Sequence, residues 1–374
     1  MLSYLTGTFS YVVPFLVVLT VLVFVHELGH YLVARWNGVR IEVFSIGFGP
    51  ELFGRNDRRG TRWRLSLIPF GGYVKMYGDA DAASAPDAAA AKAMSPEERA
   101  VSFHFKRLGQ RAAIIFAGPA ANFLFALVVL AGLYMTAGEP FTPPQIGLVQ
   151  KDSAAATAGI KPGDTIVTIN GTRISRFEDV QEAVMLDAGA PMHLVVRRGA
   201  QDLPFTVTPK MTETIDRFGN KHHFGMLGVG PRGTVNYERR DVVTAFGHAA
   251  QHIGSVVSGT FKALGQMITG ARSSEELGGP LRIAQMAGEV AQGGVLPLIS
   301  FMALLSINLG LINLFPIPVL DGGHLLFYAA EAVLGRPLGE RAQEYGFRLG
   351  FALVLMLMVF ATWNDFVQLY ARHS

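Results

Sequence analysis

Four long runs without a charged residue constrain this chain more than any other feature of its sequence. They are Met1–His26, Ala112–Gly138, Gly293–Leu320 and Leu349–Asn364. A transmembrane helix needs about 20 mostly apolar residues to cross roughly 30 Å of hydrocarbon. The first three runs are long enough, and the fourth becomes so when its ends extend past Arg348 and Asp365, which can reach the interface. We therefore predict four spans, at about 10–34, 112–137, 295–314 and 347–370.

The rest of the composition excludes several classes of protein. Charged residues make up 16% of the 374 residues, against roughly 25% in a soluble domain, and half of the chain is hydrophobic. Disorder and a soluble enzyme are therefore both disfavoured. The net charge of +3, with no concentrated basic stripe, argues against a nucleic-acid partner. Because there is no cysteine, any metal must be held by His, Asp or Glu.

The distribution of Lys and Arg predicts how the chain is oriented in the membrane. The first span lacks a basic start and its apolar run is too long for a signal peptide, so we expect it to be retained. Positive side chains gather between the first two spans, which predicts that this connection is cytoplasmic. The 138–294 segment then faces the opposite side, which is the periplasm in a Gram-negative bacterium. The basic residues are Arg35, Arg40, Arg55, Arg58, Arg59, Arg62, Arg64, Lys106, Arg107 and Arg111.

Alternating apolar and polar residues predict a cytoplasmic β-hairpin after the first span. Its strands are expected over 39–48 and 61–68, with a turn at Asn56–Gly60, and the glycine-rich stretch Pro69–Met76 follows. Further along, Pro143–Pro209 has short β-rich runs and Gly-Asp and Asn-Gly turns, which indicate a small soluble domain. We expect a second hairpin over 211–235 and amphipathic helices over 240–292. The predicted domains are 1–138, 139–210, 211–294 and 295–374.

The first span ends in His26-Glu27-Leu28-Gly29-His30, an HExxH pattern. Positions i and i+4 share one face of a helix, so both imidazoles can reach one zinc ion, while Glu27 can accept a proton from the attacking water. The alternative is a polar helix end at the membrane interface. Ionisable groups within a span cost about 2.5–3.5 kcal/mol each, which favours the functional interpretation.

Catalytic zinc usually takes three protein ligands and leaves one position open, so a third ligand is needed. Asp321 is the best candidate, because it directly follows the third uncharged run. Just before it, Pro316 and Pro318 interrupt the helix, and broken backbone at membrane depth is tolerated beside a watery cavity. The alternative is that Asp321 only caps the next helix. His248 and His252 also lie four apart, but their helix has no adjacent acid or third ligand, so we interpret them as surface or amphipathic-helix residues.

Taken together, these motifs resemble the site-2 protease family of intramembrane zinc metalloproteases, and most closely its RseP-type bacterial branch. The resemblance covers nearly the whole chain, with the motifs in the expected order on the expected spans. The pairing of HExxH in the first span with Asn-x-x-Pro-x-Pro-x-Leu-Asp-Gly at the third is its most specific part. The matching segments are His26–His30, Pro69–Met76, Phe116–Phe123 and Asn313–Gly323.

The resemblance implies one Zn²⁺ ion held by His26, His30 and Asp321, with Glu27 as the general base that activates water. It also implies that Asn313, with Pro316 and Pro318 in the same motif, helps to hold the substrate or the developing oxyanion. The segment containing Gly71, Gly72 and Tyr73 would correspond to a membrane-associated β-loop beside the substrate. An unwound substrate helix can pair with such an edge by β-addition.

The soluble insert resembles a PDZ domain through Ile146–Val149, Ala158–Asp164 and Ile169–Gly171. The RseP-type branch has members with tandem PDZ domains, whereas this chain shows one. The predicted fold is thus a multi-span α-helical membrane protein with a cytoplasmic β-hairpin or membrane-associated loop and an inserted small β-rich PDZ domain. Its expected location is the bacterial inner membrane, with the catalytic site toward the cytoplasm and the PDZ domain in the periplasm.

The expected function is intramembrane proteolysis of single-span proteins in the lipid bilayer. The resemblance implies pre-cleaved anti-sigma factors and signal-peptide remnants as substrates, and a peptide C-terminus is a candidate partner of the PDZ domain. Two alternatives come from other classes of protein. One is an intramembrane metal transporter or sensor, because His and Asp also line ion paths. The other is a non-catalytic PDZ membrane scaffold, which would hold no zinc.

Overall fold

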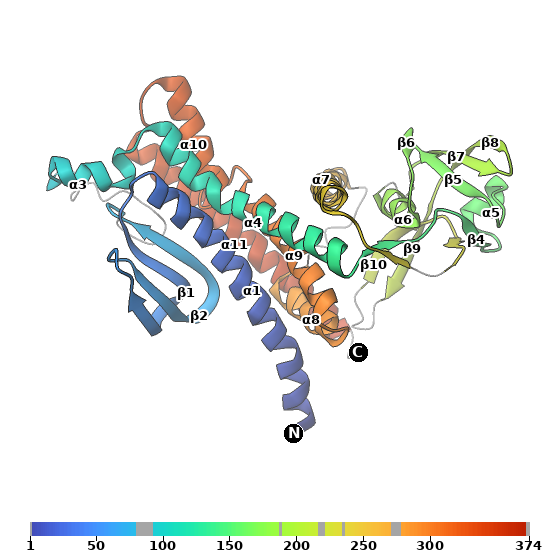
Figure 1. Ribbon diagram of the computed structural model, residues 1–374, viewed down its shortest axis with the longest axis horizontal. Coiled ribbons are helices and arrows are strands. Elements are labelled where there is room, and N and C mark those ends of the chain that lie inside the picture. Colours follow the sequence, from blue (N-terminus) through green and yellow to red (C-terminus); the bar gives the residue numbers. More distant parts are fainter. Residues whose placement is uncertain are drawn as a thin grey trace. The chain divides into compact units, whose positions relative to one another are not determined.

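The computed structural model describes residues 2–79, 93–186, 189–215, 221–233, 236–270 and 278–371. Its chain divides into two compact units. The first consists of Met1–Leu130 with Gly279–Thr362, and the second of Ala131–Gly278 with Trp363–Ser374. Figure 1 labels the elements of both units, which are described separately below.

Four helices of the described chain are long and apolar enough to cross a membrane, in agreement with the four predicted spans. The candidate spans are Ser10–Trp36, Leu108–Thr136, Val295–Asn313 and Arg341–Val367. They lie in helices α1 (Leu2–Trp36), α4 (Leu108–Thr136), α9 (Val295–Asn313) and α11 (Glu340–Ala371).

The connection between the first two spans contains the predicted hairpin, as one long antiparallel pair. Strands β1 (Ile41–Asn56) and β2 (Arg62–Met76) lie beside α1 (Figure 1). Asp57 closes the turn, because its Oδ1 accepts hydrogen bonds from the backbone N–H groups of Arg59 and Thr61. The strands run further than their alternation predicts. Instead of following the hairpin as a separate loop, the glycine-rich stretch continues β2, because its backbone pairs back onto β1 as far as Met76 opposite Ile41.

Buried apolar side chains join α1, the hairpin and α4 into one core. Phe44 stacks on Trp63 with a centroid separation of 4.2 Å, and Met76, Phe103 and Ile114 are buried in the same cluster. The segment ahead of α4 contains helix α3 (Pro96–Val101) and the 3-10 helix η1 (Phe103–Phe105). Helix α3 begins at a capping box formed by Ser95 and Glu98. This core holds α1 against α4 near the HExxH turn.

The last part of the first unit contains two helices besides α9 and α11. Helix α8 (Pro280–Gln292) packs on α1, and α10 (Asp321–Leu334) follows the break after α9. The sequence grouped α8 with the amphipathic segment 211–294, whereas the structure places it in the first unit. The reason is the close approach at Gly288, where an added Cβ would overlap Tyr11 of α1.

The second unit is the small β-rich domain with a long helix, α7 (Val242–Ile268). Its largest sheet has the order β6-β5-β7-β8 and is packed against α6 (Phe177–Leu186). The core includes Leu227, beyond the predicted boundary at residue 210, because β11 returns to pair with β4. The other elements are β3 (Glu139–Phe141), β4 (Ile146–Val149), α5 (Ala154–Ala158), β5 (Thr165–Ile169), β6 (Thr172–Arg173), β7 (Met192–Arg198), β8 (Gln201–Val207), β9 (Lys210–Ile215), β10 (Lys221–Met226), β11 (Val229–Pro231) and β12 (Asn236–Glu238).

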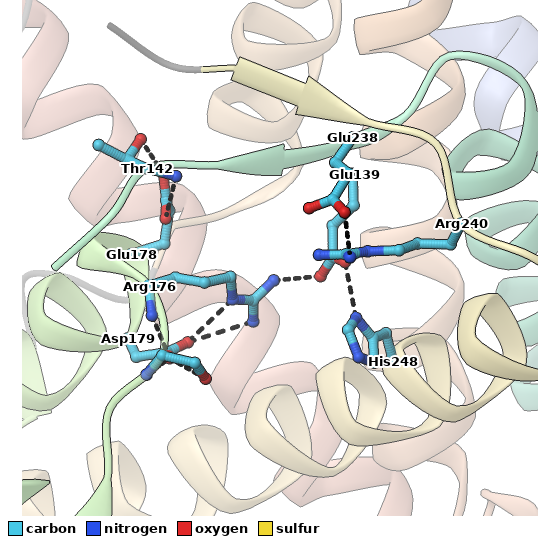
Figure 2. A network of polar contacts seen from close by, with 9 residues as sticks. Glu139, Thr142, Arg176, Glu178, Asp179, Glu238, Arg240 and His248 are labelled. Carbon is cyan, nitrogen blue, oxygen red and sulfur yellow. Dashed lines mark hydrogen bonds and ion pairs between the residues drawn. The ribbon is translucent and has the colours of Figure 1, made fainter. Parts of the chain in front are cut away.

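A buried carboxylate connects several elements of the second unit (Figure 2). Glu139 begins β3, and its side chain is 1% exposed. Its Oε2 accepts hydrogen bonds from Arg240 at 2.9 Å and His248 at 2.6 Å, and Oε1 accepts one from Arg176. His248 lies on the amphipathic helix α7, as predicted, with 34% of its side chain exposed, but its ion pair with Glu139 was not predicted. The local sequence around His248 contains no acid, and its partner lies 109 residues away.

Candidate metal centre

The two histidines of the HExxH pattern meet on one face of α1, as their spacing predicts. His26 and His30 are 9% and 6% exposed, and their Nε2 atoms lie 3.2 Å apart. Nδ1 of His30 donates a hydrogen bond to the carbonyl oxygen of Ile114 at 2.9 Å. Because that oxygen can only accept, Nδ1 carries the proton, and Nε2 of the neutral ring has a free lone pair.

The broken segment between α9 and α10 brings Asp321 to this pair. After α9 the chain passes through two prolines, and Val319 adopts a φ of 106°, which is uncommon for a β-branched residue. The segment can fold back because Gly322 has no side chain, since an added Cβ there would overlap the carbonyl oxygens of Leu314 and Phe315. Oδ2 of Asp321 then lies 3.1 Å from Nε2 of His26 and 3.5 Å from Nε2 of His30.

These three side chains form a donor set that fits zinc. Each contributes one ligand atom, and the three atoms lie within 4.8 Å of one another. Oδ2 of Asp321 is buried and has no hydrogen-bond partner in the described part of the chain, which is costly for a carboxylate oxygen unless a cation binds there. Two imidazoles and one carboxylate, with a position left open, are typical of catalytic zinc sites.

A cavity of about 280 Å³ opens at this donor set. Glu27 lines it beside the three donors, and Asn313 lines it from the end of α9. Gly71 and Gly72 approach from β2. Gly72 fits closely, because an added Cβ would lie 3.1 Å from Cγ of Glu27 and 2.6 Å from the carbonyl oxygen of Ser45. The strand edge and the donors therefore share one cavity.

The structure brings together most of the residues that the sequence singled out. Tyr73 also lines the cavity, whereas Pro316 and Pro318 are not among the described residues that do. Pro318 instead packs against α11, where an added Cβ on Gly350 would overlap its backbone. These prolines shape the chain that delivers Asp321.

Sequence reasoning assigned no role to the face of α4 behind the metal donors. Asn122 is fully buried, and its amide lies 3.1 Å from Nδ1 of His26. Gly118 is one turn earlier, where a Cβ would overlap the ring of His30. The signal was present in the segment Phe116–Phe123, because a polar side chain inside an uncharged span is unusual, but no spacing rule connects it to His26.

His324 lies behind the donor set and lines two cavities. One is the cavity at the metal donors, and the other is a smaller one of about 100 Å³ beside the ion pair of Arg111 and Glu331. Burial lowers the pKa of His324 below its usual value, which favours a neutral ring.

Comparison with known proteins places these features in a family. The model of "Peptidase family M50" matches residues 14–357. The chain is 48% identical over 366 residues to "Putative zinc metalloprotease Atu1380" of Agrobacterium fabrum, covering 97% of this chain and 96% of that protein. It is 40% identical over 381 residues to "Metalloprotease MmpA" of Caulobacter vibrioides, covering 96% of each.

A solved structure is similar to part of the chain. It is the PDZ domain of an SdrC-like protein from Listeria monocytogenes, with 18% sequence identity. The match covers 24% of this chain and 88% of that one, with a TM-score of 0.19.

Proposed function

Because the chain belongs to peptidase family M50 and is a membrane zinc metalloprotease, we propose that His26, His30 and Asp321 bind its zinc ion and that Glu27 is the general base. The observation that carries this proposal is the convergence of the three donor atoms within 4.8 Å. Glu27 lines the same cavity and is 9% exposed, so its carboxylate is held close to any water in that cavity.

The proposed reaction is hydrolysis of a peptide bond. Bound zinc polarises the scissile carbonyl and makes water acidic enough to attack near neutral pH. Glu27 accepts the proton of the attacking water and passes it to the leaving amine. Asn313 lines the same cavity and would donate an amide N–H to the substrate or to the oxyanion that develops from its carbonyl.

The proposed substrates are single-span membrane proteins that another protease has already trimmed, including anti-sigma factors and signal-peptide remnants. A helical peptide bond is shielded, so the substrate must unwind before it is cut. The edge of β2 at Gly71, Gly72 and Tyr73 supports this step, because it borders the cavity and can pair with an extended segment.

We further propose that the protein lies in the bacterial inner membrane with its catalytic end toward the cytoplasm. The basic residues between α1 and α4 support this orientation. The 138–294 segment is then periplasmic, and we propose that its β-rich domain is a PDZ domain that binds a peptide C-terminus. A groove of about 340 Å³ supports peptide binding, since Val180 and Val184 of α6 line it together with Met226 and Leu227.

The decisive experiment on the catalytic assignment uses Glu27→Gln in the purified full-length chain. The variant is expected to retain about one zinc ion per chain but to lose cleavage of a single-span substrate by at least about 10²-fold, because the amide cannot accept the proton. In cells the inactive variant should trap uncut substrates. Normal cleavage by Glu27→Gln would refute the assignment, and zinc movement across vesicles without cleavage would favour a transporter.

A further inference from the structure

The face of α4 that lies behind the metal donors touches both imidazoles of the candidate metal centre. This face consists of Ile114, Gly118 and Asn122, which are spaced four residues apart and therefore lie one above another on the helix. Ile114 and Asn122 each contact the outer nitrogen of one imidazole. Gly118, between them, leaves room for both rings.

We propose that Asn122 is a positioning residue whose side-chain oxygen accepts a hydrogen bond from Nδ1–H of His26 and so holds Nε2 toward the zinc ion. Ile114 does the same for His30 through its backbone carbonyl. This inference rests on the proposed function, since it takes both histidines as zinc ligands.

The position of the proton on the neutral His26 ring decides whether the oxygen or the nitrogen of the Asn122 side-chain amide faces that ring. Nε2 of His26 points into the donor set, 3.1 Å from Oδ2 of Asp321 and 3.2 Å from Nε2 of His30. A neutral imidazole that binds a metal through Nε2 carries its proton on Nδ1. Nδ1 is then a donor, and its neighbour at 3.1 Å must be an acceptor.

Asn122 can supply that acceptor without moving its backbone. In the structure Nδ2 faces the ring, and Oδ1 is buried with no hydrogen-bond partner among the residues that the structure describes. A half-turn of the amide exchanges the two atoms in nearly the same space. Zinc binding at Nε2 therefore selects the orientation in which Oδ1 accepts.

Asn122 is itself held rigidly, as a positioning residue needs to be. Its side chain is fully buried, and its backbone carbonyl accepts a hydrogen bond at 2.9 Å from the hydroxyl of Ser306 on α9. Asp321 begins α10, and α10 follows α9 along the chain. The hydrogen bond from Ser306 therefore connects the helix just before Asp321 to Asn122. Groups that orient a metal-binding histidine in this way typically contribute 10–100-fold to metal affinity or activity.

The test measures zinc affinity of the purified full-length chain by competition with a chromophoric chelator. Asn122→Leu keeps the approximate size of the side chain but removes the acceptor, and should bind zinc about 10–100-fold more weakly. Asn122→Asp has acceptor oxygens and no donor, and should bind zinc within a few-fold of wild type or more tightly. Asn308→Leu is the matched control, because it makes the same exchange in α9 at an amide that donates to the carbonyl oxygen of Leu304 in its own helix, and it should leave zinc affinity unchanged.

Two outcomes would overturn the proposal: unchanged zinc affinity in Asn122→Leu, or a loss in Asn122→Asp as large as in Asn122→Leu. If the leucine variant does not fold, the aspartate variant still decides whether an acceptor is what the ring needs. Nitrogen NMR of zinc-loaded wild-type protein provides a readout without a variant. The His26 signal, assigned by its absence in His26→Ala, should show a protonated Nδ1 and a metal-bound Nε2, and the reverse would contradict the proposal.

Failure of the ligand assignment is distinguishable from failure of this inference. If His26→Ala binds zinc as tightly as wild type, the proposed ligand set itself is wrong. If His26→Ala loses zinc while Asn122→Leu keeps full affinity, the ligand set stands and only the role of Asn122 is refuted.

Discussion

The first and second units each contain a buried carboxylate with several nitrogen partners, but the two differ in charge balance. Glu139 faces two guanidinium groups, from Arg176 and Arg240, and the imidazole of His248. Asp321 has ion-pair contacts with the imidazoles of His26 and His30, and among the described residues its Oδ2 accepts no hydrogen bond. Glu139 is therefore neutralised by the protein, whereas Asp321 and two neutral rings suit a divalent cation.

This difference shows how to separate a structural acid from a metal ligand when both are buried. Fixed positive side chains make a metal unnecessary at Glu139, and they would also repel one. At Asp321 the partners are groups that bind metals in their neutral form. Burial alone does not distinguish the two sites, so the identity of the partners decides.

Replacing Asp321 with Ala should abolish both zinc binding and proteolysis. Two imidazoles alone do not complete the three-ligand set of a catalytic zinc site. Zinc content, measured by elemental analysis of the purified protein, should fall from about one ion per chain to nearly none. As a control, Glu139→Ala should leave the zinc content unchanged. If Asp321→Ala retained zinc, the distinction between Glu139 as a structural acid and Asp321 as a metal ligand would be refuted.

Replacing Glu139 with Gln should destabilise the second unit. Removing one partner of a buried ionic group leaves the others uncompensated, at a cost of about 3–5 kcal/mol. Limited proteolysis and thermal unfolding of the full chain would detect the change. Asp202→Asn is the matched control, because its pair with Arg197 is about half exposed and is worth at most about 1 kcal/mol. Equal effects of the two variants would mean that the buried network is not structural.

Replacing Gly118 with Ala should weaken zinc binding by about 10–100-fold, as expected when the orientation of a ligand is disturbed. The added methyl group would overlap the ring of His30 and lie 2.9 Å from Cε1 of His26. Gly132→Ala, on the same helix, meets nothing within 4 Å and should bind zinc normally. The chelator competition described above measures both, and equal affinities would show that the close approach at Gly118 does not position the rings.

The stability of the second unit should fall on acidification. Burial raises the pKa of Glu139, but hydrogen bonds from His248 and Arg240 and the charge of Arg176 outweigh this and hold the pKa below its usual value of 4.5. A carboxyl with a lowered pKa in the folded state contributes full stability above the unfolded pKa and loses it as pH falls through the folded pKa. Unfolding followed between pH 6 and 3 should show this loss, and Glu139→Gln should show a smaller one.

Local patterns predicted a large part of the site. The four spans follow from uncharged length, and the meeting of His26 and His30 follows from helical periodicity. Asp321 was identified because an acid at the end of an uncharged run is costly without a purpose. The extension of β2 through Gly71 and Gly72 was not predicted, because glycine has low strand propensity and only pairing with β1 makes these residues a strand.

By itself, the sequence determined which residue types could bind a metal and which segments could cross a membrane, because both depend on neighbours within a few residues. Tertiary structure alone decided that Asn122 lies behind His26, although the two are 96 residues apart in the sequence. It also decided that Glu139 contacts Arg240 and His248, which are both more than 100 residues away from it in the sequence. Contacts at such separations depend on how packed helices and strands align. No local period encodes that alignment, because it results from the burial of many side chains at once.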